Sequence, residues 1–258
     1  MKSLLKIISL LSVSFLILFS CNKKPINSDK IELPAAVGDH QIIEHFAYTL
    51  SYNEEHEQAD WVAYELTKEE ATTTAYDRTD DFRADPSVTT GSADLSDYQP
   101  TENTYARGHM APAADFRWSE KAMSESFFMS NMSPQVHALN EGKWAYLEME
   151  VRHWAEIYNG VYVVTGPVLK SGLQTIGAHK VSVPEMYYKV ILDLDTEKGI
   201  GFLIPNKDIS DTFKNYAVSI DEVEKATGLD FFPALDDKLE EKVESTLNMS
   251  LWNFKYYK

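Results

Sequence analysis

Two polar stretches near the middle of the chain contain the residue types that could carry out chemistry. Arg107, Gly108 and His109 stand together in the first, and Pro112 follows them. The second, at 130–148, supplies asparagine side chains and the carboxylate Glu148. Together they provide a possible base, a cation, a neutral oxygen ligand and a carboxylate. Metal-assisted hydrolysis of a phosphodiester needs such groups to activate a water, neutralise the phosphate and assist the leaving oxygen.

The first stretch offers the base and the cation. His109 is the natural base, since an unperturbed imidazole with a pKa of about 6.5 takes a proton at neutral pH, although a single histidine is more often structural. Arg107 is permanently charged and forked, which suits a phosphate oxygen; a surface salt bridge is the alternative. Gly108 between them would let the backbone approach a ligand closely.

The second stretch offers oxygen ligands. Asn140 is a plausible ligand for Mg²⁺, which prefers oxygen and often takes only one or two protein groups. The alternative is that Asn140 satisfies backbone amides at a helix start. Glu148 could hold water molecules around a metal, or it could be an exposed helix carboxylate. Asn131 could bond either to backbone or to phosphate.

The elements that must position these residues follow from hydrophobic periodicity. Residues 139–158 have a helical pattern that places Asn140 in the first turn and Glu148 two turns further along. Three apolar side chains at 60–66 share one face of an expected strand: Val62, Tyr64 and Leu66. Other strands are expected at 127–129, 161–165, 186–193 and 199–204, and other helices at 219–228 and 236–247. This mixture lacks βαβ regularity, so the pattern predicts an α+β fold with a largely antiparallel sheet.

The N-terminus has the features of an export signal. Lys2 and Lys6 precede an apolar run at 7–19, which is shorter than the roughly 20 residues of a membrane span. We therefore expect a signal peptide at 1–20. The run ends in Leu-Phe-Ser-Cys, which resembles a bacterial lipobox, so Cys21 is expected to carry lipid; a chance cysteine after an ordinary signal is the alternative.

This interpretation predicts an exported bacterial lipoprotein, anchored to a membrane on its periplasmic face or at the cell surface. Residues 21–36 would form the lipid-anchored tether, and 37–258 a single domain. Cys21 is the only cysteine, so an intrachain disulfide is excluded. Monomer and homodimer both stay open.

The composition favours a folded chain, but its net charge is unusual for a protein that binds a polyanion. The 258 residues are 44% apolar, which excludes a disordered chain. The formal charge is −16, and the predicted signal contains two of the basic residues and no acidic ones, which leaves −18 for the rest. An acidic surface repels a polyanion such as nucleic acid. A local basic cleft remains compatible with it, because charges are screened over about 8–10 Å at ordinary salt.

The motifs at 107–115, 130–135 and 139–144 resemble those of the DNA/RNA non-specific endonucleases, the ββα-metal nucleases of the Serratia nuclease and endonuclease G type. The resemblance implies a ββα-metal (His-Me finger) core with a largely antiparallel central sheet flanked by helices. It implies that His109 is the general base and Asn140 the one direct protein ligand of Mg²⁺, with Mn²⁺ as a possible substitute. Glu148 would orient the metal's waters, and Arg107 and Asn131 would line the site.

The same resemblance implies a further arginine and a substrate class. An arginine before the histidine motif would contact the phosphate, with Arg78 the first candidate and Arg83 the second. The implied reaction is Mg²⁺-dependent, sequence-non-specific cleavage of DNA and RNA that leaves 5′-phosphate ends. Many members have aspartate directly before the motif's arginine, whereas this chain has Ala106. Two alternatives stay open: a non-catalytic surface lipoprotein that retains the fold, and a phosphodiesterase for small nucleotides, which the acidic surface favours.

Overall fold

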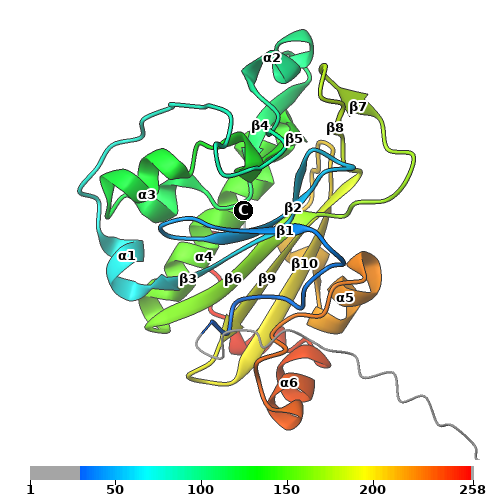
Figure 1. Cartoon of the computed structure of the whole chain (residues 1–258). Coiled ribbons are helices and arrows are strands. Elements are labelled where there is room, and N and C mark those ends of the chain that lie inside the picture. Colours follow the sequence, from blue (N-terminus) through cyan, green and yellow to red (C-terminus); the bar gives the residue numbers. More distant parts are fainter. Residues whose placement is uncertain (1–29, 257–258) are drawn as a thin grey trace, which may run out of the picture.

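A seven-stranded antiparallel sheet runs through the centre of the molecule (Figure 1). The computed structural model describes residues 30–256, so the predicted signal peptide and the lipidation site Cys21 lie outside the described residues. In spatial order the strands are β1 (Gln41–Glu44), β2 (Thr49–Asn53), β3 (Gln58–Thr67), β6 (Gly160–Pro167), β9 (Met186–Asp193), β10 (Lys198–Pro205) and β11 (Ala217–Val218). The predicted antiparallel α+β fold is confirmed.

β3 shows why the sheet forms the centre of the fold. Its side chains alternate between the two faces, and both faces are covered. Val62, Tyr64 and Leu66 enter one apolar core, while Trp61 and Ala63 enter another on the opposite face. The predicted strand and its predicted inward face are therefore confirmed, and β6, β9 and β10 also form at the predicted places.

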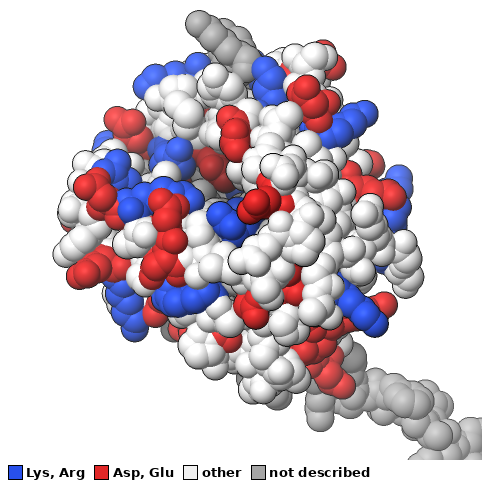
Figure 2. Space-filling model, turned by 90° about the horizontal axis from the view of Figure 1, so that it is seen from above, with Lys and Arg blue, Asp and Glu red and all other residues white. Residues whose placement is uncertain are grey.

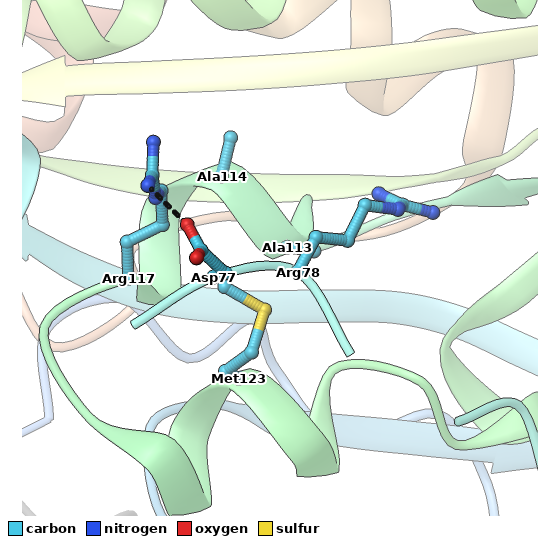
Figure 3. Close-up of a pocket in the computed structure, with 6 residues that line it drawn as sticks. All are labelled: Asp77, Arg78, Ala113, Ala114, Arg117 and Met123. Carbon is cyan, nitrogen blue, oxygen red and sulfur yellow. Dashed lines mark hydrogen bonds and ion pairs between the residues drawn. The ribbon is translucent and has the colours of Figure 1, made fainter. Parts of the chain in front are cut away.

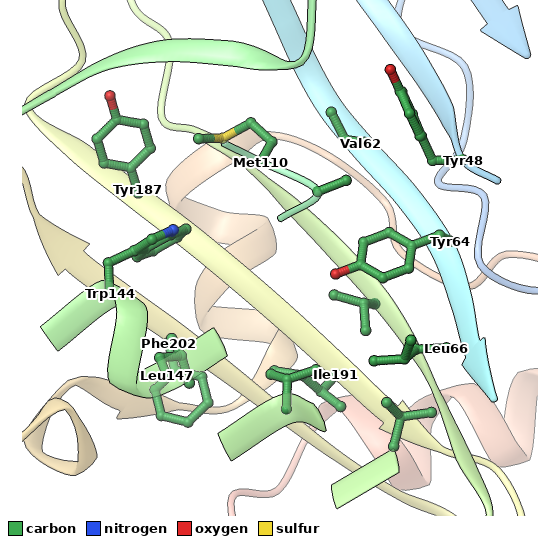
Figure 4. Close-up of a cluster of buried hydrophobic side chains, with 14 of the residues drawn as sticks. Tyr48, Val62, Tyr64, Leu66, Met110, Trp144, Leu147, Tyr187, Ile191 and Phe202 are labelled. Carbon is green, nitrogen blue, oxygen red and sulfur yellow. The ribbon is translucent and has the colours of Figure 1, made fainter. Parts of the chain in front are cut away.

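Different helices cover the two faces of the sheet. The long helix α4 (Ala145–Ile157) packs on the face of Val62 and Tyr64, where Leu147 and Trp144 fill the core (Figure 4). Two short helices, α5 (Ile220–Thr227) and α6 (Asp237–Glu244), pack against β10 on the other face. α5 begins at a Ser219 cap and ends at Gly228 in the left-handed conformation, as the sequence predicts.

A separate two-stranded sheet leads into α4. β4 (Tyr105–His109) pairs antiparallel with β5 (Met132–Val136), and the chain then enters a wide turn of π-helix (Leu139–Trp144) before α4. This ββα unit is the arrangement that the resemblance implies. Gly142 in the wide turn has non-helical angles (φ −104°, ψ −112°), so the predicted single helix over 139–158 is broken there.

The remaining elements are short and lie mainly in the connections. The other helices are α1 (Lys68–Thr72), α2 (Leu95–Tyr98) and α3 (Glu120–Glu125), and the other strands are β7 (Thr175–Ile176) and β8 (Val181–Ser182). Short 3₁₀ turns lie at Gln99–Thr101, Ala113–Phe116, Met129–Asn131, Phe213–Tyr216 and Met249–Leu251. None of the helices in the described part of the chain is long and apolar enough to cross a membrane.

Two sequence-based boundaries need correction. The expected strand at 127–129 does not form: Phe127 lies in a turn, Phe128 makes only an isolated bridge to Arg83, and a 3₁₀ turn begins at Met129. Both phenylalanines are buried, so their apolar character reflects packing. The second concerns the part of the predicted tether that the structure describes, 30–36. There Ile31 and Leu33 pack against the core under α5 and α6, and the Ala35 amide donates to the Asp230 carbonyl. The packed domain therefore includes residues before 37.

Candidate active site

His109 lies at the end of β4 within a set of aromatic rings. Its ring meets Phe127 edge to face at 5.1 Å between centroids, and Phe82 lies 5.7 Å away. The side chain is 7% exposed. Nε2 is buried, and neither ring nitrogen has a hydrogen-bond partner among the described residues. Nδ1 is open to solvent. His109 is therefore held by packing and keeps one nitrogen available.

Two guanidinium groups flank this imidazole through the same rings. Arg107 lies over the Phe82 ring, 4.3 Å from its centroid, and Arg78 lies over Phe127 at 4.7 Å. Such stacking holds an arginine without using its N–H groups. Arg107 makes no ion pair with any described residue, so the salt-bridge alternative is not realised there. Arg78 is half-exposed, and its Nε donates to Asp80 at 2.6 Å.

Burial and the two flanking charges keep the imidazole neutral. Burial, followed by the positive charges of Arg78 and Arg107, lowers the pKa of His109 to about 3. Arg83, the second candidate for the phosphate-binding arginine, does not act on this pKa. It is bonded instead to Asp81 and to the Ser124 carbonyl. The geometry therefore separates the two candidates and places Arg78 at the site.

Asn131 has a structural role at this position. Its Oδ1 accepts from the Ala111 amide at 2.9 Å, and its Nδ2 donates to the Ala111 and Ser126 carbonyls, each at 2.8 Å. The side chain is fully buried. Of the two alternatives, backbone and phosphate, the structure realises the backbone. Asn131 thus holds the chain just after His109 and does not line an open site.

Gly108 also has a different role from the expected one. A Cβ at this position would lie 2.6 Å from Oε1 of Gln135, which sits across the β4–β5 pair. The glycine is therefore needed for the close packing of Gln135 against β4. Ala106, at the position where many family members have aspartate, is paired in register with the same Gln135.

Asn140 and Glu148 occupy the wide turn and the first turn of α4. Asn140 is partly exposed, and its side chain neither caps the helix nor bonds to any described residue. Glu148 is partly buried and likewise makes no hydrogen bond with the part of the chain that the structure describes. Gly142 interrupts the helix between the two residues. Glu148 therefore does not lie two regular helical turns beyond Asn140, as the sequence pattern predicts.

Sequence reasoning missed a buried charge network beneath Glu148. Lys189 of β9 is 1% exposed; its Nζ donates to Thr165 at 2.6 Å and lies 5.0 Å from the Trp144 ring. Burial raises the pKa of Glu148 and lowers that of Lys189, while each charge opposes the shift of the other. The sequence signal for this network is the lysine at 189 within the apolar pattern of β9.

A second charged pair extends the network under the same helix. Asp115 is 1% exposed, and Arg152 of α4 donates to it at 2.7 Å while the Tyr64 hydroxyl donates to its other oxygen at 2.7 Å. Arg78 acts on the pKa of Glu148 as well as on that of His109. The charge of Arg78 therefore acts on residues of both β4 and α4.

An open pocket lies beside Arg78. It has a volume of about 270 Å³ and is lined by Asp77, Arg78, Ala113, Ala114, Arg117 and Met123. Figure 3 shows that Arg117 is paired with Asp77, whereas Arg78 points away from that pair. The face in Figure 2 interleaves basic and acidic side chains, with several basic ones around a hollow near its centre. Local positive charge does exist at His109, where Arg78 and Arg107 both act on the imidazole, despite the net charge of −16.

Two side chains of the wide turn and α4 have the chemistry that a hydrated divalent cation needs. Asn140 offers a neutral oxygen and Glu148 a carboxylate, and both are partly exposed and free of partners among the described residues. One or two such groups are what Mg²⁺ commonly takes from a protein, the rest being water and substrate oxygens. The groups of three or more mutually close His, Asp or Glu side chains that the described residues form lie elsewhere in the fold.

Comparisons with known proteins agree with this arrangement. A family model for the DNA/RNA non-specific endonucleases matches residues 27–238. Mitochondrial nuclease EXOG of Danio rerio is 37% identical over 206 residues, which cover 73% of this chain and 60% of that protein. Nuclease C1 of Cunninghamella echinulata var. echinulata is 37% identical over 212 residues, covering 75% and 83%. Human mitochondrial endonuclease G is 35% identical over 204 residues, covering 72% and 68%.

The structural comparison gives the same result. A chain from the crystal structure of the EndoG/EndoGI complex matches with a TM-score of 0.73 and 32% identity, covering 82% of this chain and 94% of that one. The predicted ββα-metal fold is thereby confirmed. The chain spans less than two thirds of the zebrafish relative, at 60% of its length. On the match over 27–238 and these relatives, the chain belongs to the DNA/RNA non-specific endonuclease family.

Proposed function

We propose that this protein is a Mg²⁺-dependent endonuclease that hydrolyses phosphodiester bonds of DNA and RNA without sequence preference. The observation that carries the proposal is the neutral, unpaired imidazole of His109 between two guanidinium groups. Family membership supports the reaction class. The non-catalytic alternative would have no use for a buried imidazole held beside two cations.

In the proposed reaction His109 is the general base. With its proton on the buried Nε2, the neutral ring presents a lone pair at Nδ1, the nitrogen that solvent reaches. Nδ1 takes a proton from the water that attacks phosphorus. Arg78 and Arg107 would favour the reaction by binding the phosphate oxygens as negative charge develops.

The helix side of the site would hold the cation. Asn140 would be its direct protein ligand, and Glu148 would accept hydrogen bonds from water around it. When bound, the cation neutralises the phosphate and stabilises the leaving 3′ oxygen. Burial raises the pKa of Glu148 to about 7, and Lys189 and Arg152 oppose that rise, so the share of charged carboxylate grows as the pH rises through 7. A charged Glu148 is needed for this role, because a protonated carboxyl is a weaker acceptor.

One panel of substrates tests the proposal. Purified protein is incubated with supercoiled plasmid, with single-stranded RNA and with a small diester such as bis(p-nitrophenyl) phosphate, each with Mg²⁺, with Mn²⁺ and with EDTA. We expect metal-dependent nicking of plasmid and degradation of RNA. New ends should be labelled by polynucleotide kinase only after phosphatase treatment, since the products carry 5′-phosphate.

The same panel separates the alternatives. Activity on the small diester without activity on either polymer would favour a small-nucleotide phosphodiesterase. Inactivity on all three with a folded protein would favour the non-catalytic alternative. Full activity in EDTA would contradict the role of Asn140.

We also propose export and lipid anchoring through Cys21, on the lipobox-like sequence at 18–21. The test is expression of the full chain in a bacterial host with a lipoprotein-processing pathway. The wild-type chain should partition into detergent and lose residues 1–20, whereas Cys21→Ala should do neither. A Cys21→Ala variant that partitions like the wild type contradicts the anchor.

A further inference from the structure

A second group of charged side chains lies between α5 and α6, outside the candidate active site. Asp221 and Glu224 belong to α5, and Glu244 is the last residue of α6. One carboxylate oxygen from each lies within 4.8 Å of the others. In Figure 1 these helices lie at the end of the molecule away from β4 and β5, so the group is separate from His109.

Glu244 is the unusual member of the group. It is 6% exposed, its Oε1 is fully buried, and its carboxyl makes no hydrogen bond or ion pair with any residue that the structure describes. Burial, followed by the charges of Glu224 and Glu240, raises the pKa of Glu244 to about 9. Every charged group that shifts this pKa is another carboxylate. A buried carboxyl without a partner is unfavourable, so the geometry leaves a counter-charge to be supplied.

The fold holds the three carboxyls in place from two sides. Gly228 turns the chain back after α5, and the Phe231 amide then donates to Oε1 of Glu224 at 2.8 Å. α6 sits tightly on β10, since a Cβ on Gly199 would lie 2.3 Å from the Val243 carbonyl. Asp221 is exposed. The group therefore has a buried side and a side open to water.

The other close group of acidic and histidine side chains, Asp94, Asp97 and His179, differs in this respect. Asp97 accepts from the His179 backbone amide at 2.9 Å and from its Nδ1 at 2.7 Å, and it also accepts from the Asp94 amide. Its carboxylate is satisfied by the chain itself. The group between α5 and α6 has no such donors for Glu244.

We propose that Asp221, Glu224 and Glu244 bind a calcium ion that joins α5 to α6. Calcium takes six to eight oxygen ligands at about 2.3–2.6 Å, so oxygens across the ion are separated by about 4.6–5.2 Å. Three carboxylate oxygens within 4.8 Å of one another fit inside that sphere. Water completes the coordination on the Asp221 side. Magnesium fits less well, because it demands a tight octahedron and sheds its water reluctantly.

Calorimetric titration of the purified full chain with CaCl₂ tests the proposal. The titration is done in an Asn140→Ala background, which removes the proposed ligand of the catalytic cation. We expect one calcium ion per chain. Asp221→Asn and Glu224→Gln should each weaken calcium binding at least about tenfold, since affinity follows the number of charged ligands.

A matched control comes from the same helix. Glu241→Gln removes one charge from an exposed position of α6 outside the group and should leave calcium affinity unchanged. Absence of calcium binding, or equal affinity in the Asp221→Asn variant, overturns the proposal. Equal affinity for MgCl₂ overturns the assignment to calcium. Because binding is read directly, these outcomes do not depend on whether the protein cleaves nucleic acid.

Discussion

The two faces of the central sheet both bury charged side chains, but they neutralise them in different ways. Beneath α4, Glu148 lies near Lys189, and Asp115 is bonded to Arg152. Beneath α5 and α6, the charged groups that shift the pKa of Glu244 are all carboxylates. The chain thus supplies the counter-charges where chemistry is proposed, which keeps that site formed before a ligand arrives. On the other face the charged groups that act on Glu244 supply no counter-charge, and the proposed calcium ion would provide one.

The largest expected effect is the loss of activity when His109, on the catalytic face, is replaced. His109→Ala should lower kcat/KM on plasmid DNA by about 10²–10⁴-fold, the usual contribution of a general base. Melting temperature should also fall, because the substitution leaves a cavity where the imidazole packs against Phe127 and Phe82, so activity is measured below the unfolding range of the variant. His137→Ala is the matched control, since His137 is exposed and bonded to Glu141. Equal losses in both variants would contradict the role of His109.

The next effect concerns stability on the β4 side. Asn131→Ala removes three buried hydrogen bonds to backbone and should lower the free energy of unfolding by about 2–4 kcal/mol. Activity should fall with it, because the chain after His109 loses its anchor. Urea unfolding gives the first value and plasmid nicking the second. A stable Asn131→Ala protein with full activity would show that this anchor is dispensable.

Arg78 and Arg83 provide a paired comparison. Arg78→Ala should lower kcat/KM by about 10–100-fold, the equivalent of a charge-assisted hydrogen bond of about 1.5–3 kcal/mol. Arg83→Ala should change kcat/KM by less than about threefold, since this arginine is committed to Asp81 and Ser124. Steady-state cleavage of a labelled duplex measures both. A reversed order would mean that Arg83 contacts the phosphate.

The pH dependence of stability tests the buried imidazole. The pKa of His109 is lowered to about 3 in the folded protein, against about 6.5 when unfolded. The contribution of the neutral imidazole to the free energy of unfolding is fully present above pH 6.5. It is lost as the pH falls toward 3, because only the unfolded state takes up the proton in this range. At pH 5 the loss should be about 2 kcal/mol. Urea unfolding at pH 7 and pH 5 should show a smaller decrease for His109→Gln than for the wild type.

The smallest effects contrast the two buried glutamates directly. Glu148→Gln leaves Lys189 buried beside a neutral group and should destabilise the protein by about 1–2 kcal/mol. Glu244→Gln without calcium removes the cost of burying a carboxyl that must take up a proton in the folded state, and should stabilise it by about 1 kcal/mol. Thermal unfolding in EGTA measures both signs. Two changes of the same sign would remove the distinction between the faces.

Most of the regular elements could be predicted from the sequence, for identifiable reasons. β3 and β9 have enough alternating apolar residues to be recognised, and the motif around His109 is local. The sequence leaves two roles open for Asn131, bonding to backbone or to phosphate. Its partners, Ala111 and Ser126, are brought together only in the folded chain. Lys189 and Phe82 were missed, since their importance comes from long-range packing. The strand expected at Phe127 failed because burial in a loop and burial in a strand require the same apolar residues.

Chemical rescue of His109→Ala by imidazole tests the central claim most directly. The substitution leaves a cavity between Phe82 and Phe127 that is bounded by Arg78 and Arg107. The account predicts that the single-turnover rate of plasmid cleavage with Mg²⁺ rises with the concentration of added imidazole, and that across pH it follows the neutral form alone. A rate that tracks imidazolium, or a His109→Ala protein that already cleaves at the wild-type rate, would contradict the assignment of His109 as the base.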